Sequence, residues 1–552
     1  MKLTKRILSL ALAALLVCFA GQAAFVGAQA ARTNYPTIYM AGGWHELFDS
    51  TTGERAFDPT DSMMYDPEFK EQFAQAIKSL DIDALGDALI TMFTKAYADI
   101  AMDCDGESID PNLVNNDTFY YPVGFLEWLT GEDDASLPDE LIELKGQVRA
   151  RDDGILKHCP PTANDTIYFL SNEGYFSFDW RVDPVLNARR LHAWIEETFI
   201  DTEVSDKVNL TAVSGSGPIM MAYLHEYGTQ YLNSVMLNEA FISGSSLWGG
   251  IALKKFGVDP DSLGNTGPMY YWSMQDLFTP NVIKGIRAFY EIGLLDVAAK
   301  VINFVASKAF DRLYEEALTP MWFHMPYYWA LVPHSMYEQA KKAQFPTAAE
   351  YAKRAKLFEK TDYFQNEVMA NSDQILRDAA AKIKIGIYCG YGLPLSPYTT
   401  TSYVSSDELV DTEYASAGAT CAPPNRPFNG FFYKQAKPGN VPGYSYVSPD
   451  RYVDASTCIL PDHTWFCKGR PHESDLRVDG WVEWFANAPK GEDTVHSNAT
   501  YPQWMQWVRV GTVKPLDYID TFWKKLLDML LDVLMYLAKL WRKVLLLPLF
   551  WM

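Results

Sequence analysis

Short apolar runs alternate with helical patterns along this chain, and this alternation limits the fold more than any other feature. Amphipathic stretches such as residues 187–199 lie between runs that are rich in β-branched and aromatic residues. Strands that alternate with helices favour a parallel sheet covered by helices. We therefore expect an α/β fold with a mostly parallel central sheet. The expected strands are residues 36–40, 166–170, 207–213, 233–238, 382–388 and 463–468.

Residues 251–380 interrupt this alternation with a long helical segment that is crowded with large side chains. Two of its stretches, "MYYWSMQDLF" and "MWFHMPYYWALVPH", are mostly aromatic or apolar. A segment of this kind between two strands is expected to cover the carboxyl edge of the sheet as a helical cap insertion. Its aromatic residues either form the core of that cap or line a wide apolar cleft.

The first thirty residues have the composition of a secretory signal peptide. Lys2, Lys5 and Arg6 precede a long apolar run, and the small residues "AQA" end at Ala30, where a signal peptidase would cut. We therefore expect a secreted or extracytoplasmic protein whose mature chain begins near Ala31. A retained membrane anchor is the alternative, because the apolar run is long for a signal peptide.

The other end of the chain, residues 516–552, is predicted to be an amphipathic helix. Asp528 and Asp532 lie within its apolar sequence and argue against a helix that spans a membrane. This tail could make peripheral contact with a membrane surface, pack on the domain or pair with a second copy, and the sequence leaves all three open. Residues 31–250 and 381–515 are expected to form the two parts of the core.

The composition excludes some partners and indicates others. The formal charge is −22 at pH 7, and an acidic surface repels phosphates, so nucleic acid is not an expected partner. Six cysteines remain beyond residue 30, and none has the spacing of a zinc site, so we expect no metal and no cofactor. Cys389 and Cys467 lie in apolar strands and suit buried thiols. An exported chain can oxidise the others, and the pairs we expect are Cys104 with Cys159 and Cys421 with Cys458.

The segment "VNLTAVSGSG" at residues 208–217 combines an apolar strand, a turn of small residues and the start of a helix. This is the pattern of a nucleophile elbow, a tight turn that exposes a serine above the sheet. Small residues are needed because the strand and the helix cross closely behind that serine. With Ser214 as nucleophile, Ala212 and Ser216 fill these positions, whereas Ser216 as nucleophile would put Pro218 at one of them. We therefore predict that Ser214 is the nucleophile.

A serine hydroxyl needs a base, and in this fold class an acid and then a histidine follow the serine along the chain. Asp407 lies in the loop after the strand expected at 382–388, where the orienting acid belongs. His472 lies just past the strand expected at 463–468. We predict these two residues as acid and base. Their rivals are Glu408 and Asp411 for the acid, and His463 and His496 for the base.

An attacking serine also requires donors for the negative oxygen of the tetrahedral intermediate. The turn Ala41-Gly42-Gly43-Trp44 follows the first strand and allows close approach of the backbone. We predict that the N–H groups of Gly43 and Gly215 form this oxyanion hole.

Several segments together resemble the lecithin:cholesterol acyltransferase and lysosomal phospholipase A2 family of α/β-hydrolases. "PTIYMAGGWHEL" is similar to the family's first strand and P-G-x-x-G turn, "FSFDWRVDP" at 176–184 to its "YDWR" stretch, and "SGSSLWGG" at 243–250 to its "APWGG". The elbow, "IYCGYGLPLSPYT" and "SSDELVDTEYAS" resemble further family pieces in the same order. The resemblance covers about residues 35–475, and the "DWR" segment is its most specific part.

This resemblance implies an α/β-hydrolase fold in which Ser214, Asp407 and His472 form a catalytic triad. It also implies that Gly43 and Gly215 form the oxyanion hole and that Trp180 stands near an acyl groove. The substrate-binding residues that we expect on this basis are Trp44, Trp180 and Trp248.

The sequence also departs from the family pattern at three positions. Val213 stands where the family has a histidine before the serine, Ser216 where it has a glycine, and Glu408 where a glycine follows the acid. These departures affect the expected substrate and rate more than the expected fold.

The function we expect is that of an exported serine lipase, phospholipase or O-acyltransferase that acts on lipid esters through an acyl-Ser214 intermediate. Because the elbow is altered, a catalytically impaired lipid-binding envelope protein is an alternative. A soluble carboxylesterase for small esters is another, which the aromatic cap disfavours.

Overall fold

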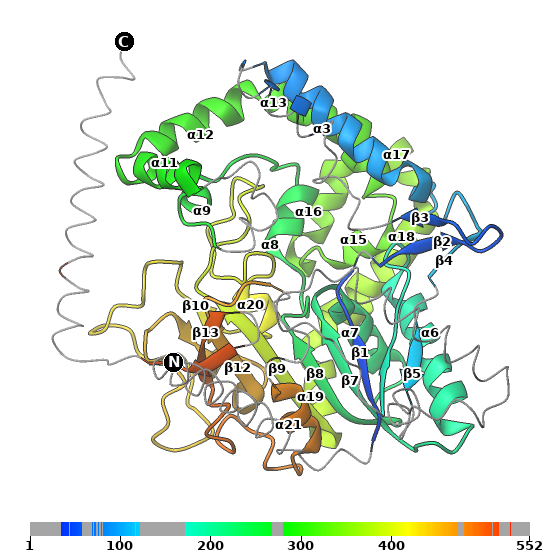
Figure 1. Ribbon diagram of the computed structural model, residues 1–552, viewed down its shortest axis with the longest axis vertical. Helices are drawn as coiled ribbons and strands as arrows, with labels where there is room; N and C mark the ends of the chain where they lie inside the picture. Colours follow the sequence, from blue (N-terminus) through cyan, green and yellow to red (C-terminus); the bar gives the residue numbers. More distant parts are fainter. Residues whose placement is uncertain are drawn as a thin grey trace, which may run out of the picture.

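A computed structural model describes most of the chain (Figure 1). The described residues are 35–43, 45–57, 81–115, 118–121, 172–267, 280–472, 480–509 and 512–517, with single residues between 69 and 79 and at 478 and 530. Several sequence predictions fall on residues outside this set. They are the signal peptide 1–30, the strand 166–170, Trp44, Cys159 and almost all of the tail 516–552.

A nine-stranded sheet forms the centre of the molecule. Its strands in chain order are β1 (Thr37–Met40), β5 (Phe119–Tyr121), β6 (Glu173–Tyr175), β7 (Val208–Val213), β8 (Leu232–Asn238), β9 (Lys384–Tyr391), β12 (Thr464–Lys468), β13 (Trp504–Arg509) and β14 (Thr512–Pro515). In space the order is β14-β13-β12-β9-β8-β7-β1-β6-β5. All neighbours from β13 to β6 are parallel, and only the edge strands β14 and β5 pair antiparallel. The expected mixed α/β fold with a mostly parallel sheet is confirmed.

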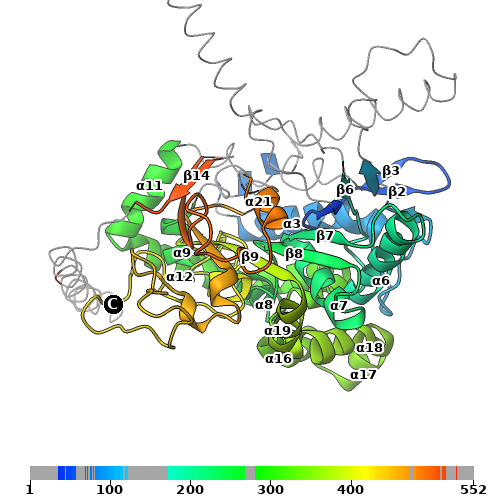
Figure 2. The same ribbon diagram turned by 90° about the horizontal axis from the view of Figure 1, so that it is seen from below.

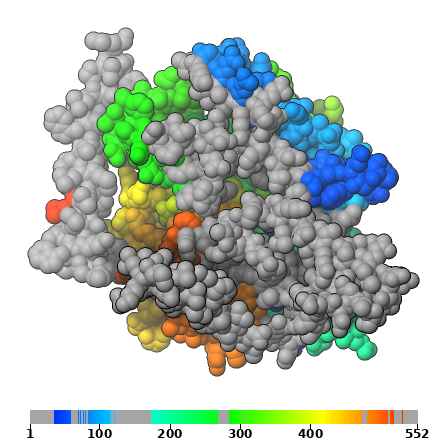
Figure 3. All heavy atoms as spheres, viewed as in Figure 1, coloured from blue at the N-terminus to red at the C-terminus, as the bar shows by residue number. Residues whose placement is uncertain are grey.

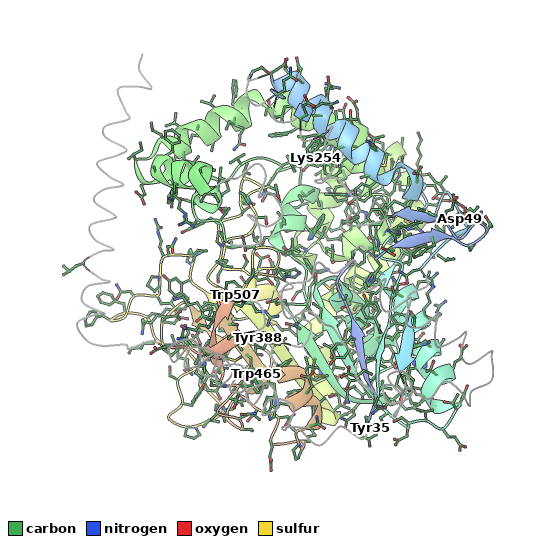
Figure 4. All side chains as sticks on the ribbon, in the orientation of Figure 1. Tyr35, Asp49, Lys254, Tyr388, Trp465 and Trp507 are labelled. Atoms are coloured by element: carbon green, nitrogen blue, oxygen red, sulfur yellow. The ribbon has the colours of Figure 1, made fainter. Side chains whose placement is uncertain are left out.

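Residues of the central strands alternate between two hydrophobic cores, one on each face of the sheet. Tyr388 of β9 and Trp465 of β12 are partners in register and lie in the smaller core, where they are close together in Figure 4. Their chain neighbours Cys389 and Phe466 belong to the larger core. Because both faces are covered, these strands carry apolar side chains on both faces, as buried parallel strands do.

Helices cover both faces of the sheet. Helix α21 (Trp481–Asn487) contributes Trp481 and Phe485 to the smaller core. The larger core includes residues of α6 (Pro184–Ile195), α7 (Gly217–Glu226) and α19 (Ser372–Lys382). Figure 2 shows α21 on the opposite side of the strands from α7 and α19.

The described residues between β8 and β9 are almost entirely helical. The main helices are α8 (Ser246–Ala252), α9 (Pro260–Gly264), α11 (Pro280–Glu291), α12 (Leu294–Val305), α13 (Ser307–Leu313), α15 (Pro326–Ala330), α16 (His334–Gln344), α18 (Ala355–Tyr363) and the sheet-covering α19. The parallel strands run upward from Tyr35 in the view of Figure 4, and α11, α12 and α13 lie beyond their carboxyl ends in the same view (Figure 1).

Helix α3 (Ile82–Tyr97) adds to this layer from the N-terminal part of the chain. Gly86 of α3 leaves room for Ala309 of α13, because a Cβ at that glycine would lie 3.0 Å from the alanine Cβ. Arg312 of α13 forms an ion pair with Asp87, with 3.0 Å between nitrogen and oxygen. Helix α3 was not predicted from the sequence. Neither was a small three-stranded sheet of β2 (Leu47–Asp49), β3 (Arg55–Phe57) and β4 (Leu113–Val114).

Five cysteines lie in the described part of the chain, and all are free thiols: Cys104, Cys389, Cys421, Cys458 and Cys467. The structure therefore does not contain the expected Cys421–Cys458 disulfide. The Cys421 thiol contacts the carbonyl oxygen of Ala419 at 3.7 Å instead. Cys389 and Cys467 are fully buried.

Among the helices that the structure describes, none is both long and apolar enough to cross a membrane.

Candidate active site

The turn after β7 holds Ser214 in a strained backbone conformation. Its φ is +54°, which is unfavourable for a residue with a side chain and is characteristic of the serine in a nucleophile elbow. A short 3₁₀ turn, Ser214–Ser216, joins β7 directly to α7. Gly217 leaves room for this crossing, because a Cβ there would lie 2.8 Å from the backbone nitrogen of Phe241. A glycine at position 217 is thus required by close packing of backbone.

Ser214, His472 and Asp407 form one hydrogen-bonded chain. The Nε2 atom of His472 lies 2.7 Å from the Ser214 Oγ, and Nδ1 lies 2.8 Å from the Asp407 Oδ2. A carboxylate can only accept, so Nδ1 carries the proton and the lone pair of Nε2 faces the serine. All three side chains are buried. The arrangement has the connectivity by which a histidine can take the proton of a serine hydroxyl.

The acid loop holds Asp407 by its other oxygen and its backbone. The backbone N–H groups of Leu409 and Val410 donate to Asp407 Oδ1 at 2.9 and 2.7 Å. The backbone N–H of His472 donates to the Asp407 carbonyl at 2.9 Å, which ties the acid loop to the histidine loop. Gly390 of β9 permits this approach, because a Cβ there would lie 2.7 Å from the Asp407 Cβ.

The rival acids have other partners. Asp411 accepts a hydrogen bond from the backbone N–H of Ser246 at 2.7 Å, and burial raises its pKa to about 6. Glu408 accepts from the backbone N–H of Gly267 at 3.0 Å.

The rival histidines and serine also lie outside the hydrogen-bonded chain. His463 contacts the Asp493 carbonyl at 3.0 Å, and His496 contacts Asp462 at 3.0 Å. The Ser216 hydroxyl donates to the carbonyl oxygens of Val213 and Met40 at 2.8 and 3.1 Å. Its role is therefore to link the elbow to the end of β1.

Gly43 and Gly215 come together beside the serine. A Cβ built on Gly215 would lie 2.8 Å from the backbone nitrogen of Gly43, so the turn after β1 lies against the turn after β7. These two backbone segments are the ones whose N–H groups the sequence predicts as the oxyanion hole. The loop also contains His45, whose pKa burial lowers to about 4, so this side chain is neutral at pH 7.

The segment "DWR" braces the loop after β1. The indole N–H of Trp180 donates to the carbonyl of His45 at 3.0 Å, and the ring is fully buried beside Phe57 and Tyr328. Arg181, also fully buried, makes two bonds to Asp179, at 3.0 and 2.8 Å. Trp180, which was predicted to contact substrate near an acyl groove, is thus buried against the loop after β1.

Trp248, the other described tryptophan of the predicted substrate contacts, lies in α8. It is 7% exposed, and the centres of its neighbouring rings, Trp322 and Tyr328, are 5.3 and 5.0 Å away. It belongs to an aromatic cluster that joins the core to the helical segment.

A buried ion pair beside the triad was not identified from the sequence. Glu239 follows β8, and its carboxylate lies 2.8 Å from the Nε atom of Arg470, with both side chains at most 1% exposed. The guanidinium also lies over the ring of Tyr388, 5.0 Å from its centre. Arg470 stands two residues before His472, so the pair fixes the loop that carries the histidine. The only signal in the sequence was the position of both charged residues directly after apolar strands.

Glu239, Asp407 and His472 offer the one group of possible metal ligands among the described residues, with atoms within 4.8 Å of one another. Both nitrogens of His472 already face Ser214 and Asp407. Arg470 neutralises Glu239. In these contacts the cluster forms a network of charged and hydrogen-bonded groups around His472.

Comparison with known proteins identifies no family for this chain. No family model matches it, and no curated protein matches it. One solved structure with some likeness is the crystal structure of the Tle4–Tli4 complex, with 14% identity and a TM-score of 0.20. The match covers 40% of this chain and about half, 48%, of that one.

Proposed function

We propose that this protein is a serine acyl hydrolase or acyltransferase of the α/β-hydrolase fold that acts on lipid esters. One observation carries the proposal: the hydrogen-bonded chain Ser214–His472–Asp407 starts from a serine with positive φ at a strand-to-helix turn. An α/β-hydrolase places its nucleophile at this kind of turn above a parallel sheet. The resemblance to the lecithin:cholesterol acyltransferase and lysosomal phospholipase A2 family supports a lipid ester as substrate.

The proposed reaction uses these residues in two half-reactions. His472 takes the proton of Ser214 while the serine oxygen attacks the ester carbonyl, and the N–H groups of Gly43 and Gly215 stabilise the oxyanion. The C–O bond of the ester then breaks, and His472 gives the proton to the departing alcohol. Water or a second alcohol next attacks the acyl-Ser214 through the same histidine and releases the acid or a new ester.

We propose that the helical segment 251–380 forms a cap over this site. We also propose that the protein is exported and that its tail, residues 516–552, contacts lipid. A lipid substrate has long acyl chains, and an aromatic segment next to the nucleophile suits them. The complete hydrogen-bonded triad favours an active enzyme over a catalytically impaired lipid-binding protein.

The test is covalent labelling with a fluorophosphonate probe, followed by assays with phospholipid vesicles and with a short soluble ester. Ser214→Ala should abolish labelling and lower turnover by about 10⁶-fold, the scale seen when a catalytic serine is removed. Ser216→Ala is the matched control, because it removes a neighbouring buried hydroxyl that faces carbonyl oxygens.

This control should keep at least part of the labelling. If a folded Ser216→Ala protein lost all labelling while Ser214→Ala was still labelled, the nucleophile would be Ser216 and the assignment of Ser214 would be wrong. Preference for the soluble ester over vesicle lipid would favour the small-ester carboxylesterase instead.

A further inference from the structure

A tyrosine hydroxyl from the helical segment lies directly against the two oxyanion-hole glycines. A Cβ built on Gly215 would lie only 1.8 Å from the Oη atom of Tyr327, and one on Gly43 would lie 3.0 Å from it. Neither glycine has a positive φ, unlike eleven other described glycines. The absence of a side chain at these two positions is therefore explained by close neighbours, namely the Tyr327 hydroxyl at both glycines and also the Gly43 backbone nitrogen at Gly215, and not by a positive φ.

Tyr327 is held rigidly in this place. It lies in the first turn of α15 and is 2% exposed. Its backbone N–H points to the carbonyl oxygen of Arg181 at 3.4 Å, and its ring lies 6.4 Å from that of Phe178, centre to centre. The "DWR" segment thus supports both sides of the hole: Trp180 bonds to the loop after β1, and Arg181 contacts the helix that carries the tyrosine.

We propose that the Tyr327 hydroxyl is the third donor of the oxyanion hole, and this inference rests on the proposed acyl-transfer function. Its Oη atom lies beside both backbone segments whose N–H groups receive the substrate oxygen. A phenolic O–H is neutral at pH 7 and can donate while keeping its proton. In a buried site, a fixed donor stabilises the charge that develops on the carbonyl oxygen more strongly than water does. Tyr327 is thereby a catalytic residue that links the helical segment to the chemistry.

Tyr327→Phe tests this directly, because it removes the hydroxyl and keeps the ring. On the soluble ester, kcat should fall by about 10²- to 10³-fold, the usual effect of losing one oxyanion donor, while KM changes little. The affinity for an alkyl boronic acid, which forms a tetrahedral adduct with the serine, should fall with kcat/KM. The affinity for an unreactive ether analogue of the substrate should stay the same.

Tyr337→Phe is the matched control. Tyr337 lies in α16 of the same helical segment, is 1% exposed and hydrogen-bonds Thr361 and Asp362, each at 2.7 Å. Its loss should lower stability and leave kcat within a few-fold of the wild type, with unchanged boronate affinity.

Each outcome decides the matter. Undiminished or increased kcat in Tyr327→Phe would overturn the inference and show that the hydroxyl only fills or blocks the hole. A fall of equal size in Tyr337→Phe would also overturn it, as a general effect of packing. If the wild-type protein neither reacts with fluorophosphonate nor hydrolyses any ester, the proposed function is wrong and the role of Tyr327 is wrong with it. If the wild type is labelled, the Tyr327→Phe result tests the role of the tyrosine alone.

Discussion

The two halves of the helical segment between β8 and β9 have opposite exposure. In α11, α12 and the turn between them, large apolar side chains face solvent, among them Phe289 at 53%, Ile292 at 66% and Phe304 at 81% exposed. These helices form part of the molecular surface in Figure 3. From α13 onward, Trp322, Tyr327 and Trp329 are at most 6% exposed. The helical segment therefore divides into a surface layer with exposed apolar side chains and a packed layer with buried aromatic side chains.

The packed half, from α13 onward, contacts the proposed active site through Tyr327. The exposed half, α11 and α12, makes no such contact among the residues that the structure describes. Trp329 packs against Tyr337 and Phe358, with both ring centres 5.8 Å away. Tyr327, two residues earlier in the same helix, lies against Gly43 and Gly215, the glycines of the proposed oxyanion hole. The apolar residues of α12 have no comparable ring contacts within the described part of the chain. We infer that substitutions in the packed half lower the turnover of every substrate, whereas substitutions in the exposed half lower only the turnover of lipid in vesicles.

The largest effect is expected at the triad. Asp407→Asn should lower kcat by about 10⁴-fold, because the amide leaves His472 in the wrong tautomer. Turnover of vesicle lipid and of a soluble ester should fall equally, and steady-state assays on both substrates measure this. Asp411→Asn in the same loop is the matched control and should retain most activity, since an asparagine oxygen can still accept from Ser246. Equal losses in the two variants would contradict the assignment of the acid.

The sheet and the triad could be predicted from the sequence because their signals are local. Most of the central parallel strands are short apolar runs with a turn after them, so residues 207–213 and 233–238 indicated β7 and β8, whereas β6 and β13 were not predicted. The order of serine, acid and histidine then placed each group at the carboxyl end of a strand. Parallel strands bring these ends to one edge, which is why residues far apart in sequence meet there.

The rest depended on contacts between distant segments. Nothing near Tyr327 in the sequence indicates that its hydroxyl reaches Gly215, since both features are ordinary in isolation. The Glu239–Arg470 pair is likewise formed by two loops that only the completed sheet brings together. The disulfide between Cys421 and Cys458 was expected from an exported chain rather than from geometry, and the structure has free thiols there.

A smaller effect distinguishes the two halves by stability. Trp329→Ala should lower the free energy of unfolding by about 3–5 kcal/mol, because it leaves a cavity in a packed aromatic cluster. Phe304→Ala should change it by no more than about 0.5 kcal/mol, as expected for an exposed residue. Urea unfolding followed by tryptophan fluorescence and by circular dichroism measures both. Comparable losses in the two variants would show that residues outside the described set cover Phe304 and that the comparison between the halves is wrong.

The smallest effect concerns the exposed half and the physical state of the substrate. A lipid surface would bury part of the apolar side of α11 and α12, and each large side chain buried contributes about 1.5–3 kcal/mol. Phe304→Ser should therefore weaken binding to phosphatidylcholine vesicles, and turnover of vesicle lipid at low lipid concentration, by about tenfold. Turnover of a soluble ester should stay unchanged, because Ser214 lies in the packed region. Phe432→Ser is the matched control, since Phe432 is 79% exposed but lies outside the helical segment. Vesicle sedimentation measures binding, and initial rates measure turnover. If both phenylalanine variants lose binding equally, or if Phe304→Ser lowers the turnover of both substrates equally, the exposed half does not contact lipid.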